Sequence, residues 1–565
     1  MTVLANILSF ASEQQRLAYE DTLDPYIILA LFKGTEADLA EAILHYKGIV
    51  LDSIIEDRLV AEASKGHEDH DLIRQLAGDK NQLGQLLLRT PNKASTEADE
   101  KIADLEREVD EIEGRLAQHV SYLGRTRRAL SVSVEQVQSA IPKDAALIEF
   151  VRYSHYLGNG NSEQRYGAIV LASNGQPAWI PLASIGAVNK LISRYQRLVR
   201  DTSDEAELLA ILEKLYIELW APVERSLPSG VKRIIISPDG QLNFVSFATL
   251  VDSNERFLAE TYSVQYVASG RDLLREITPT TRKEAIVFAN PDFTLDSNQT
   301  IAQADHESSS TIPSVVRGNE KRDLKDLFFG SLKGTQTECD KLSEAFANWS
   351  WNTISFTGKD ATKEALFRIH SPYILHLATH GFFESENQTD ATENGLQLVN
   401  EERNAFQSKF FNNPMHRSGL ALAGAQTTLR AWRRADSSMP AIENDGIVTA
   451  EDVAALDLKG TWLVTLSACD TGSGEAKAGE GVMGLRRGFM QAGTQNLLMT
   501  LWPISDETTV QIMADFYDAA RETADAPGAL ANVQRDWLVK IRHERGLAQA
   551  VSLAGPFIMS FQGPP

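Results

Sequence analysis

The stretch WLVTLSACDTG (462–472) places one of the two cysteines of the chain directly after an apolar, strand-like run. A helix-like run (482–492), a second apolar run (496–502) and another helix-like run (506–520) follow it. Strands that alternate with helices predict a mostly parallel sheet with helices on both faces. In such sheets active sites lie beyond the carboxyl ends of the strands, which is where Cys469 is expected.

A second apolar run, YILHLATHG (373–381), ends in a histidine and a glycine. Parallel strands end at the same edge of a sheet, so His380 and Cys469 are expected to meet there. A thiol with a pKa of ~8.5 is mostly protonated at neutral pH, and a histidine can take that proton and later give it to a leaving amine. The backbone N–H groups of Gly381 and Cys469 are candidates for an oxyanion hole. The alternative is an inert cysteine, because free cysteine is often buried.

Composition narrows the class of protein. The 565 residues predict about three or four folding units, and the net charge of −22 argues against a nucleic-acid binder, which needs a basic face. Two cysteines, Cys339 and Cys469, cannot build a disulfide framework or a cysteine metal site, and they suit a reducing cytosol. The start MTVLANILSF lacks the features of a secretory signal, and no apolar run approaches the ~20 residues that span a bilayer. We therefore expect a cytoplasmic protein without membrane or direct nucleic-acid contact.

Three regions differ in pattern. Residues 1–132 read as helices and are expected to contain a helical hairpin. Apolar residues recur there at intervals that alternate between three and four residues, at Ile102, Leu105, Val109, Ile112 and Leu116. Residues 133–280 mix short β-rich runs with helices, and residues 281–565 contain the two strand ends described above. A polar stretch at about 384–440 is expected to be an insertion.

Two blocks resemble the signature blocks of the CHAT family, the caspase-like domains often found beside tetratricopeptide repeats. They are HLATHGFF (376–383) and LSACDTGSGEAKAGEGVMGLRRGFMQAGTQNLLMTLWPISDE (466–507). Further similar segments, in the order of the family, occur at 234–250, 262–274, 418–425 and 445–472. The similarity runs from about residue 209 almost to the C-terminus. It implies a caspase-like three-layer α/β/α sandwich with a mostly parallel sheet.

Residue by residue, the resemblance carries the histidine of the family onto His380 and its cysteine onto Cys469. It implies hydrolysis of a peptide bond by a Cys–His dyad, with no cofactor and no metal. Separase-like members of the wider clan pair an inactive caspase-like subdomain with an active one. Region 133–280 offers no cysteine and suits the inactive part, whereas 281–565 suits the active part. Residues 1–132 resemble the helical segment that commonly precedes the domain, but recognisable repeats are absent.

The resulting hypothesis is a regulated cysteine endopeptidase that cleaves a specific protein partner, in bacterial defence or cell-death signalling. An activating protein or ribonucleoprotein is the expected partner, and the insertion 384–440 and the loop 471–481 are the expected activation elements. The alternative is a non-catalytic, caspase-like scaffold that binds protein partners. A third hypothesis is a nucleotide-switched regulator using GEGVMG (479–484). About ten loop residues separate that motif from its strand, which disfavours a dinucleotide fingerprint.

Acidic residues near the cysteine are candidates for an S1 pocket, the site that would bind a basic side chain next to the scissile bond. They are Asp470, Glu480 and Asp506. Other roles stay open: Asp506 would begin a helix, where an acidic residue favours the positive end of the helix dipole, and Glu480 would lie in a solvated loop.

The remaining histidines and the second cysteine are assigned structural roles. His376 lies four residues before His380, a zinc-binding spacing on a helix, but in a strand we expect a supporting core histidine. His67 and His70 are expected in a solvated turn. Cys339 lies on an amphipathic helix and is expected to be structural.

Overall fold

The computed structural model describes residues 2–22, 34–63, 67–89, 96–122, 127–295, 328–383, 414–434, 445–467, 475–477, 480–503 and 506–564. No helix among these residues is both long enough and apolar enough to span a bilayer. They also contain no cluster of three or more histidine, cysteine or acidic side chains that could hold a metal ion.

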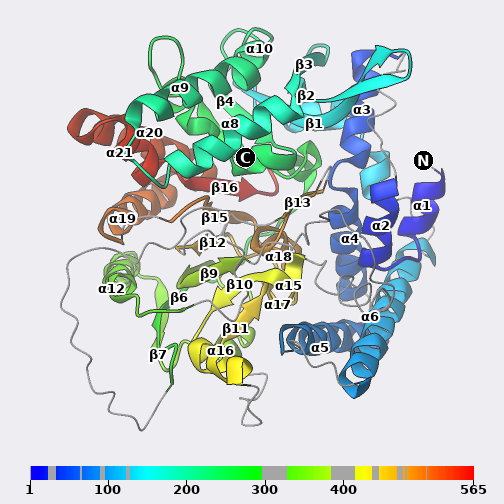
Figure 1. Ribbon diagram of the computed structural model, residues 1–565. Helices are drawn as coiled ribbons and strands as arrows, with labels where there is room; N and C mark the ends of the chain where they lie inside the picture. The colour runs from blue at the N-terminus through cyan, green and yellow to red at the C-terminus, as the bar shows by residue number, and fades with distance from the viewer. Residues whose placement is uncertain are drawn as a thin grey trace, which may run out of the picture.

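In the described part of the chain, eleven strands form one sheet in the order β3-β2-β1-β4-β5-β16-β15-β12-β8-β6-β7 (Figure 1). Their bounds are β1 (Ala145–Gly158), β2 (Asn161–Ala172), β3 (Ala178–Ser184), β4 (Arg233–Ser237), β5 (Ser263–Tyr266), β6 (Glu284–Pro291), β7 (Asn352–Gly358), β8 (Ile374–Ala378), β12 (Leu463–Leu466), β15 (Asn496–Thr500) and β16 (Phe557–Phe561). Within this sheet the neighbours pair in parallel except β1–β2, β2–β3 and β15–β16. The predicted mostly parallel sheet is confirmed.

The helices cover both faces of this sheet. The N-terminal ones are α1 (Thr2–Leu8), α2 (Glu13–Thr22), α3 (Glu36–Tyr46), α4 (Ile49–Ala63), α5 (His67–Arg89), α6 (Thr96–Tyr122) and α7 (Val134–Ala140). The middle ones are α8 (Ile185–Leu198), α9 (Glu205–Leu215), α10 (Ala221–Glu224), α11 (Leu258–Thr261), α12 (Lys333–Asn348) and α13 (Lys363–Phe367). The C-terminal ones are α15 (Pro414–Arg417), α16 (Ala425–Arg434), α17 (Ala450–Ala454), α18 (Leu485–Gln491), α19 (Asp506–Thr523), α20 (Ala526–Arg545) and α21 (Leu547–Ala554).

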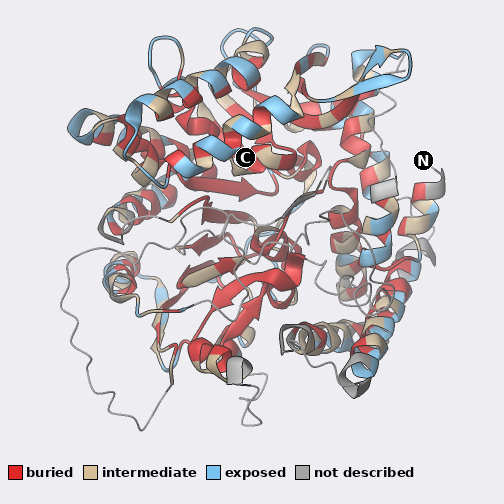
Figure 2. Cartoon of the chain, viewed as in Figure 1, coloured by how far each residue is buried: buried red, intermediate tan, exposed pale blue. Residues whose placement is uncertain are grey.

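Side-chain alternation along the strands explains the layers. In β1, Ile148 and Phe150 lie in the core that contains α8 and α9, whereas Leu147 and Val151 lie in the core with α3 and α7. A strand turns successive side chains to opposite faces, so a strand that is apolar at every position must be covered on both sides. The central strands are buried throughout (Figure 2). The predicted three-layer α/β/α sandwich is confirmed.

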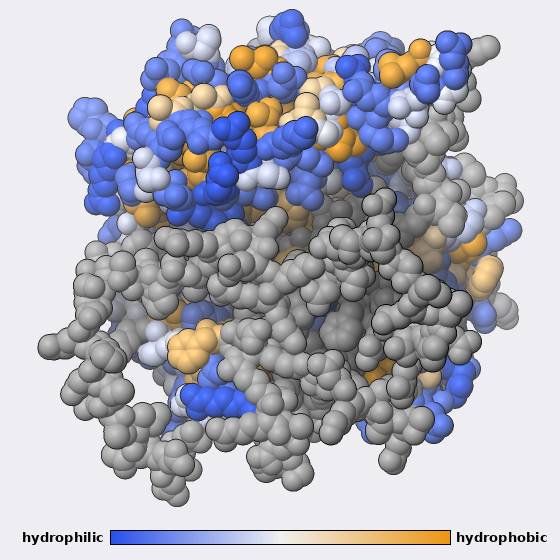
Figure 3. Space-filling view, viewed as in Figure 1, coloured by the Kyte–Doolittle hydropathy of each residue, from blue (hydrophilic) through white to orange (hydrophobic). Residues whose placement is uncertain are grey.

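The outer surface over α8, α9 and α10 is mainly hydrophilic, with apolar residues scattered over it (Figure 3). Ile217 of η3 (Tyr216–Trp220), which follows α9 in the chain, is 61% exposed. Scattered exposed apolar residues are ordinary on protein surfaces.

The C-terminal strand joins the two halves of the sheet. β16 pairs antiparallel with β15, and Ser560 of β16 lies opposite Tyr266 of β5 in a parallel pair. One continuous sheet therefore contains strands from both predicted regions, 133–280 and 281–565. The boundaries 1–132, 133–280 and 281–565 stay predictions.

Two small sheets flank the large one. β9 (His380–Phe383), β10 (Ser418–Ala421) and β11 (Ile447–Thr449) form one antiparallel sheet, with β10 in its centre. β13 (Glu475–Lys477) pairs with β14 (Gly481–Met483) to form the other. Residues 414–434 form α15, β10 and α16, and β10 is buried. The prediction of one polar insertion over 384–440 is therefore wrong for this part, because its short apolar run completes the β9 sheet.

Helices α5 and α6 pack against each other at the lower right of Figure 1. The apolar stripe of α6 is buried at Ile102, Leu105, Val109, Ile112 and Leu116, with Leu83 and Leu72 of α5 in the same clusters. His67 and His70 belong to the first turn of α5, so the predicted turn at these histidines is wrong.

Truncating a side chain of β16 tests the role of this strand. Ile558 is 1% exposed and lies opposite Met499. We expect Ile558→Ala to lower the free energy of unfolding by about 2–5 kcal/mol, because it removes buried methyl groups and leaves a cavity. Chemical denaturation followed by circular dichroism measures this change.

The matched control for this substitution is Val539→Ala on α20. Val539 is 44% exposed, so the same kind of truncation should change stability by about 0.5 kcal/mol or less. Equal effects of the two substitutions would contradict the role given to β16.

Candidate active site

His380 begins β9, directly after β8 has ended at Ala378. Its Nε2 lies 2.8 Å from the carbonyl oxygen of Gly330. A carbonyl oxygen only accepts hydrogen bonds, so Nε2 carries the hydrogen and the neutral ring has its basic lone pair at Nδ1. The rings of Phe293 and Phe329 lie 5.2 and 5.6 Å from the imidazole, centroid to centroid. The aromatic neighbours and the carbonyl together fix the orientation and the tautomer of His380.

The strand that leads to the cysteine runs beside the strand that leads to the histidine. Leu466 of β12 lies opposite Leu377 of β8, and the N–H of Ser467 donates to the carbonyl of Leu377 at 3.0 Å. The two strand ends therefore share one edge of the sheet. Cys469 lies outside the described residues, so its meeting with His380 stays a prediction. Gly381 lies in β9 opposite Leu420, and its oxyanion role also stays a prediction.

A buried polar network lies beneath these strand ends. His376 is fully buried, with Nδ1 at 3.0 Å from the Tyr517 hydroxyl and Nε2 at 3.2 Å from a carboxylate oxygen of Glu338. The other oxygen of Glu338 accepts a hydrogen bond from the hydroxyl of Ser467 at 3.0 Å. His376 is thus a core histidine, as predicted. Sequence reasoning missed Glu338; its place beside Cys339, on the apolar face of a predicted helix, was the available signal.

Cys339 is the free cysteine among the described residues, and it is 2% exposed. Burial raises the pKa of its thiol, so the thiol stays protonated at neutral pH. The sulfur lies 4.0 Å from the hydroxyl of Ser343. A protonated and buried thiol is a poor nucleophile, and the predicted structural role of Cys339 is confirmed.

Glu480 is buried rather than solvated. One carboxylate oxygen accepts the backbone N–H of Val50 at 2.9 Å, and the other accepts that of Leu51 at 3.2 Å and Nη1 of Arg487 at 3.2 Å. Burial raises the pKa of Glu480, although the charge of Arg487 opposes this rise. The alternative of a solvated loop is wrong. A role in an S1 pocket would require at least one of these contacts to break.

The other two candidates for the S1 pocket stay predictions. Asp506 is the first residue of α19, which agrees with the expected helix start. Asp470 lies outside the described residues. The segment 481–483 of GEGVMG forms β14, whose partner is β13, and α18 begins at Leu485.

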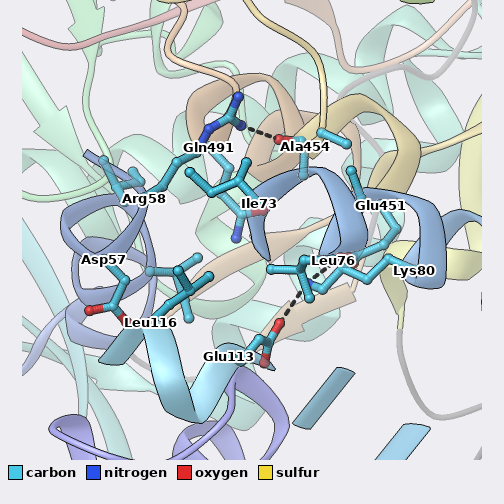
Figure 4. Close-up of a pocket in the computed structure, with 14 residues that line it drawn as sticks. Asp57, Arg58, Ile73, Leu76, Lys80, Glu113, Leu116, Glu451, Ala454 and Gln491 are labelled. Atoms are coloured by element: carbon cyan, nitrogen blue, oxygen red, sulfur yellow. Dashed lines mark hydrogen bonds and ion pairs between the residues drawn. The ribbon is translucent and has the colours of Figure 1, made fainter. Parts of the chain in front are cut away.

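Two cavities lie away from the strand ends. One of about 100 Å³ is bordered by α4, α5, α6, α17 and α18, and Lys80 and Glu451 line it (Figure 4). The other, of about 630 Å³, is lined by Tyr216, Glu224 and Asp252. Neither lining includes a residue of β8, β9 or β12. Both cavities therefore lie apart from the candidate site at His380.

Comparison with known protein families identifies the family of this chain. The CHAT domain matches residues 209–545, more than half of the chain. The chain belongs to the CHAT family. The match to the CHAT domain begins in α9 and ends with α20, so it includes β4 to β15 and both strand ends of the candidate site. The family membership predicted from the sequence is confirmed.

Two solved structures that resemble this chain are complexes of separase with securin. Two crystal structures of the Saccharomyces cerevisiae separase–securin complex, at 3.0 and 2.6 Å resolution, have TM-scores of 0.42 and 0.41 and identities of 7% and 8%. The match covers 91% of this chain in both cases, and 40% and 38% of those chains. This CHAT protein therefore spans about two fifths of the length of the structures it matches. No curated protein matches it.

His416 makes the contact between α15 and the helical hairpin sensitive to pH. It is 7% exposed, and a Cβ added at Gly84 of α5 would lie 3.1 Å from its Nδ1. Burial lowers its pKa below the ordinary 6.5, although Glu451 opposes this shift. The unfolded chain therefore takes up a proton more readily than the folded chain. This stabilising contribution is complete above about pH 6.5 and is lost as pH falls through the folded pKa.

We expect the melting temperature of the wild type to fall between pH 7.5 and pH 5.5 by more than that of His416→Gln. The control is His370→Gln, because His370 is exposed and pairs with the surface residue Asp457 at 3.3 Å. Differential scanning fluorimetry at both pH values measures the effect. Equal pH slopes for the wild type and His416→Gln would contradict the assignment.

Proposed function

We propose that this protein is a regulated cysteine endopeptidase in which Cys469 is the nucleophile and His380 the general base. The single observation that carries the proposal is the pairing of β8 with β12, which brings the segment before the cysteine beside the strand of the histidine. The Gly330 carbonyl adds to it, because it leaves the basic lone pair of His380 on Nδ1. Membership of the CHAT family supports the same chemistry.

The proposed hydrolysis needs the Cys469 thiol, the His380 imidazole, two backbone N–H groups and one water molecule. His380 Nδ1 takes the thiol proton, and the thiolate sulfur attacks the carbonyl carbon of the peptide. The N–H groups of Gly381 and Cys469 donate to the oxyanion of the tetrahedral intermediate. The C–N bond then breaks, and the imidazolium gives its proton to the leaving amine. Water, deprotonated by His380, hydrolyses the thioester and releases the acid and the free thiol.

Region 133–280 supports the role of an inactive partner subdomain. Its parallel strand β4 ends at Ser237, whose hydroxyl donates to the Ala268 carbonyl at 2.8 Å and accepts from Lys47 Nζ at 2.6 Å. Lys47 Nζ also lies 2.9 Å from Glu149. A hydroxyl held in this way inside the protein serves packing, so we assign the chemistry to 281–565.

We further propose that the substrate is a specific protein partner and that an activating protein or ribonucleoprotein controls cleavage in the cytoplasm, in bacterial defence or cell-death signalling. Asp470 and Asp506 are the proposed S1 residues, and they favour a basic side chain before the scissile bond.

Thiol alkylation tests the dyad. Iodoacetamide should label Cys469 of the wild type at pH 7 about 10- to 100-fold faster than Cys469 of His380→Ala, because loss of the base lowers the thiolate fraction. Peptide mass spectrometry separates Cys469 from Cys339 and gives each rate. The control is His370→Ala, which removes an exposed histidine away from the strand ends. Equal rates for the wild type and His380→Ala would favour the non-catalytic scaffold.

Cleavage products test the activity. New N-termini are identified by mass spectrometry in cells that carry the neighbouring genes, with either the wild type or Cys469→Ala. We expect a small set of cleaved proteins, with basic residues before the cut, only in the wild type. The same products in Cys469→Ala cells would overturn the proposal.

A further inference from the structure

After Cys469 the structure describes β13 (Glu475–Lys477) and then the chain from Glu480, which is eleven residues beyond Cys469. The carboxylate of Glu480 lies at the N-terminal end of α4, where it accepts the N–H groups of Val50 and Leu51. The first turn of a helix has N–H groups without intrahelical partners. The first intrahelical bond of α4 runs from the N–H of Asp52 to the Gly48 carbonyl, and glycine has no side chain with which to cap a helix. Glu480 therefore supplies the cap from a distant part of the chain.

Arg487 of α18 holds the same carboxylate from the other side. Its Nη1 lies 3.2 Å from Glu480 and its Nη2 lies 2.8 Å from Glu13 of α2. The side chains of Glu480 and Arg487 are 0% and 1% exposed. Burial opposes the charge of Arg487, but Glu13 and Glu480 outweigh this and raise its pKa. A charged group buried in this way keeps its place only while its partners are present.

The ion pairs continue into the helical hairpin. Lys80 of α5 lies 2.7 Å from Glu113 of α6 and 2.6 Å from Glu451 of α17 (Figure 4). It also lies 3.7 Å from Glu13. Burial opposes ionisation of Glu13, but Arg487 and Lys80 outweigh it and lower its pKa to about 2. One connected set of charges thus joins α2, α5 and α6 to α17, α18 and the end of the cysteine segment.

We propose that Glu480 is a positioning residue that anchors the chain beyond Cys469 to the first turn of α4, so that loss of this one contact changes the reactivity of Cys469. The effect of this anchor on catalysis depends on the proposed function, in which Cys469 is the nucleophile. The anchor itself depends only on the contacts of Glu480. Its carboxylate points toward α4, which separates this role from an S1 pocket. The N-terminal helical region is then part of the working enzyme.

The experiment compares Glu480→Gln with a control that weakens α4 elsewhere. The control is Asp52→Asn on α4. Asp52 accepts from Nε of Arg271 at 2.6 Å and also pairs with Arg275, and Arg271 belongs to η6 (Gly270–Leu274). The full chain is treated with iodoacetamide between pH 6 and pH 9. Peptide mass spectrometry gives the alkylation rates at Cys469 and at Cys339. Because Cys339 is buried, its rate reports on unfolding of the protein. The melting temperature of each variant is measured in parallel.

We expect Glu480→Gln to lower the rate at Cys469 about tenfold or more at pH 7, because small misplacements of reacting groups cost this much. The rate at Cys339 should stay the same. Asp52→Asn should lower the melting temperature while it changes the rate at Cys469 by less than about twofold. An unchanged or increased rate in Glu480→Gln would overturn the proposal. An equal loss in Asp52→Asn would do so too, since any weakening of α4 would then suffice.

A second variant keeps the test decisive if Glu480→Gln does not fold. Val50→Pro removes one N–H donor to Glu480 at a first-turn position, where proline is tolerated. It should reproduce the loss at Cys469. His380→Ala in the same series separates the two ideas. An unchanged rate there ends the proposed dyad, whereas a loss there without a loss in the Glu480 and Val50 variants ends the anchor alone.

Discussion

The parallel pairing of β8 with β12 is the constraint on which the candidate site depends. Leu377 and Leu466 are register partners, and the next backbone N–H, that of Ser467, also bonds to β8. Both strands are fully buried, so a shift by one residue would leave backbone groups unpaired and turn every side chain to the opposite face. The chain therefore leaves both strands at fixed and neighbouring points.

Buried charges fix how the N-terminal helices sit on the sheet. Lys47 bonds to Glu149 and to Ser237 in the middle of the molecule, and Arg487 bonds to Glu13 at another point of the same interface. A buried ion that loses its partner costs about 3–5 kcal/mol, so only a docking that satisfies all of them is stable. Apolar contacts alone would tolerate sliding, whereas these pairs specify one arrangement.

Local patterns were sufficient for much of the fold. Alternating strands and helices predicted the mostly parallel sheet, and the three and four spacing of Ile102 and Leu105 predicted a helix with one buried face. Both signals are local, because the period of side chains along a strand or a helix depends only on backbone geometry. The order of the strands was not predictable in this way. β16 enters between β5 and β15, and that pairing joins residues nearly 300 positions apart, Ser560 and Tyr266.

The sequence by itself determined the family, the two strand ends and the identities of His380 and Cys469 as candidates. The tertiary structure decided the tautomer of His380, which depends on the Gly330 carbonyl, and the environment of Glu480. That glutamate lies in a glycine-rich segment, where every local signal favours a solvated loop. Its partner Val50 is 430 residues away in the chain. Whether a carboxylate is solvated or buried depends on the groups that surround it in space, and those groups come together only when the helices dock.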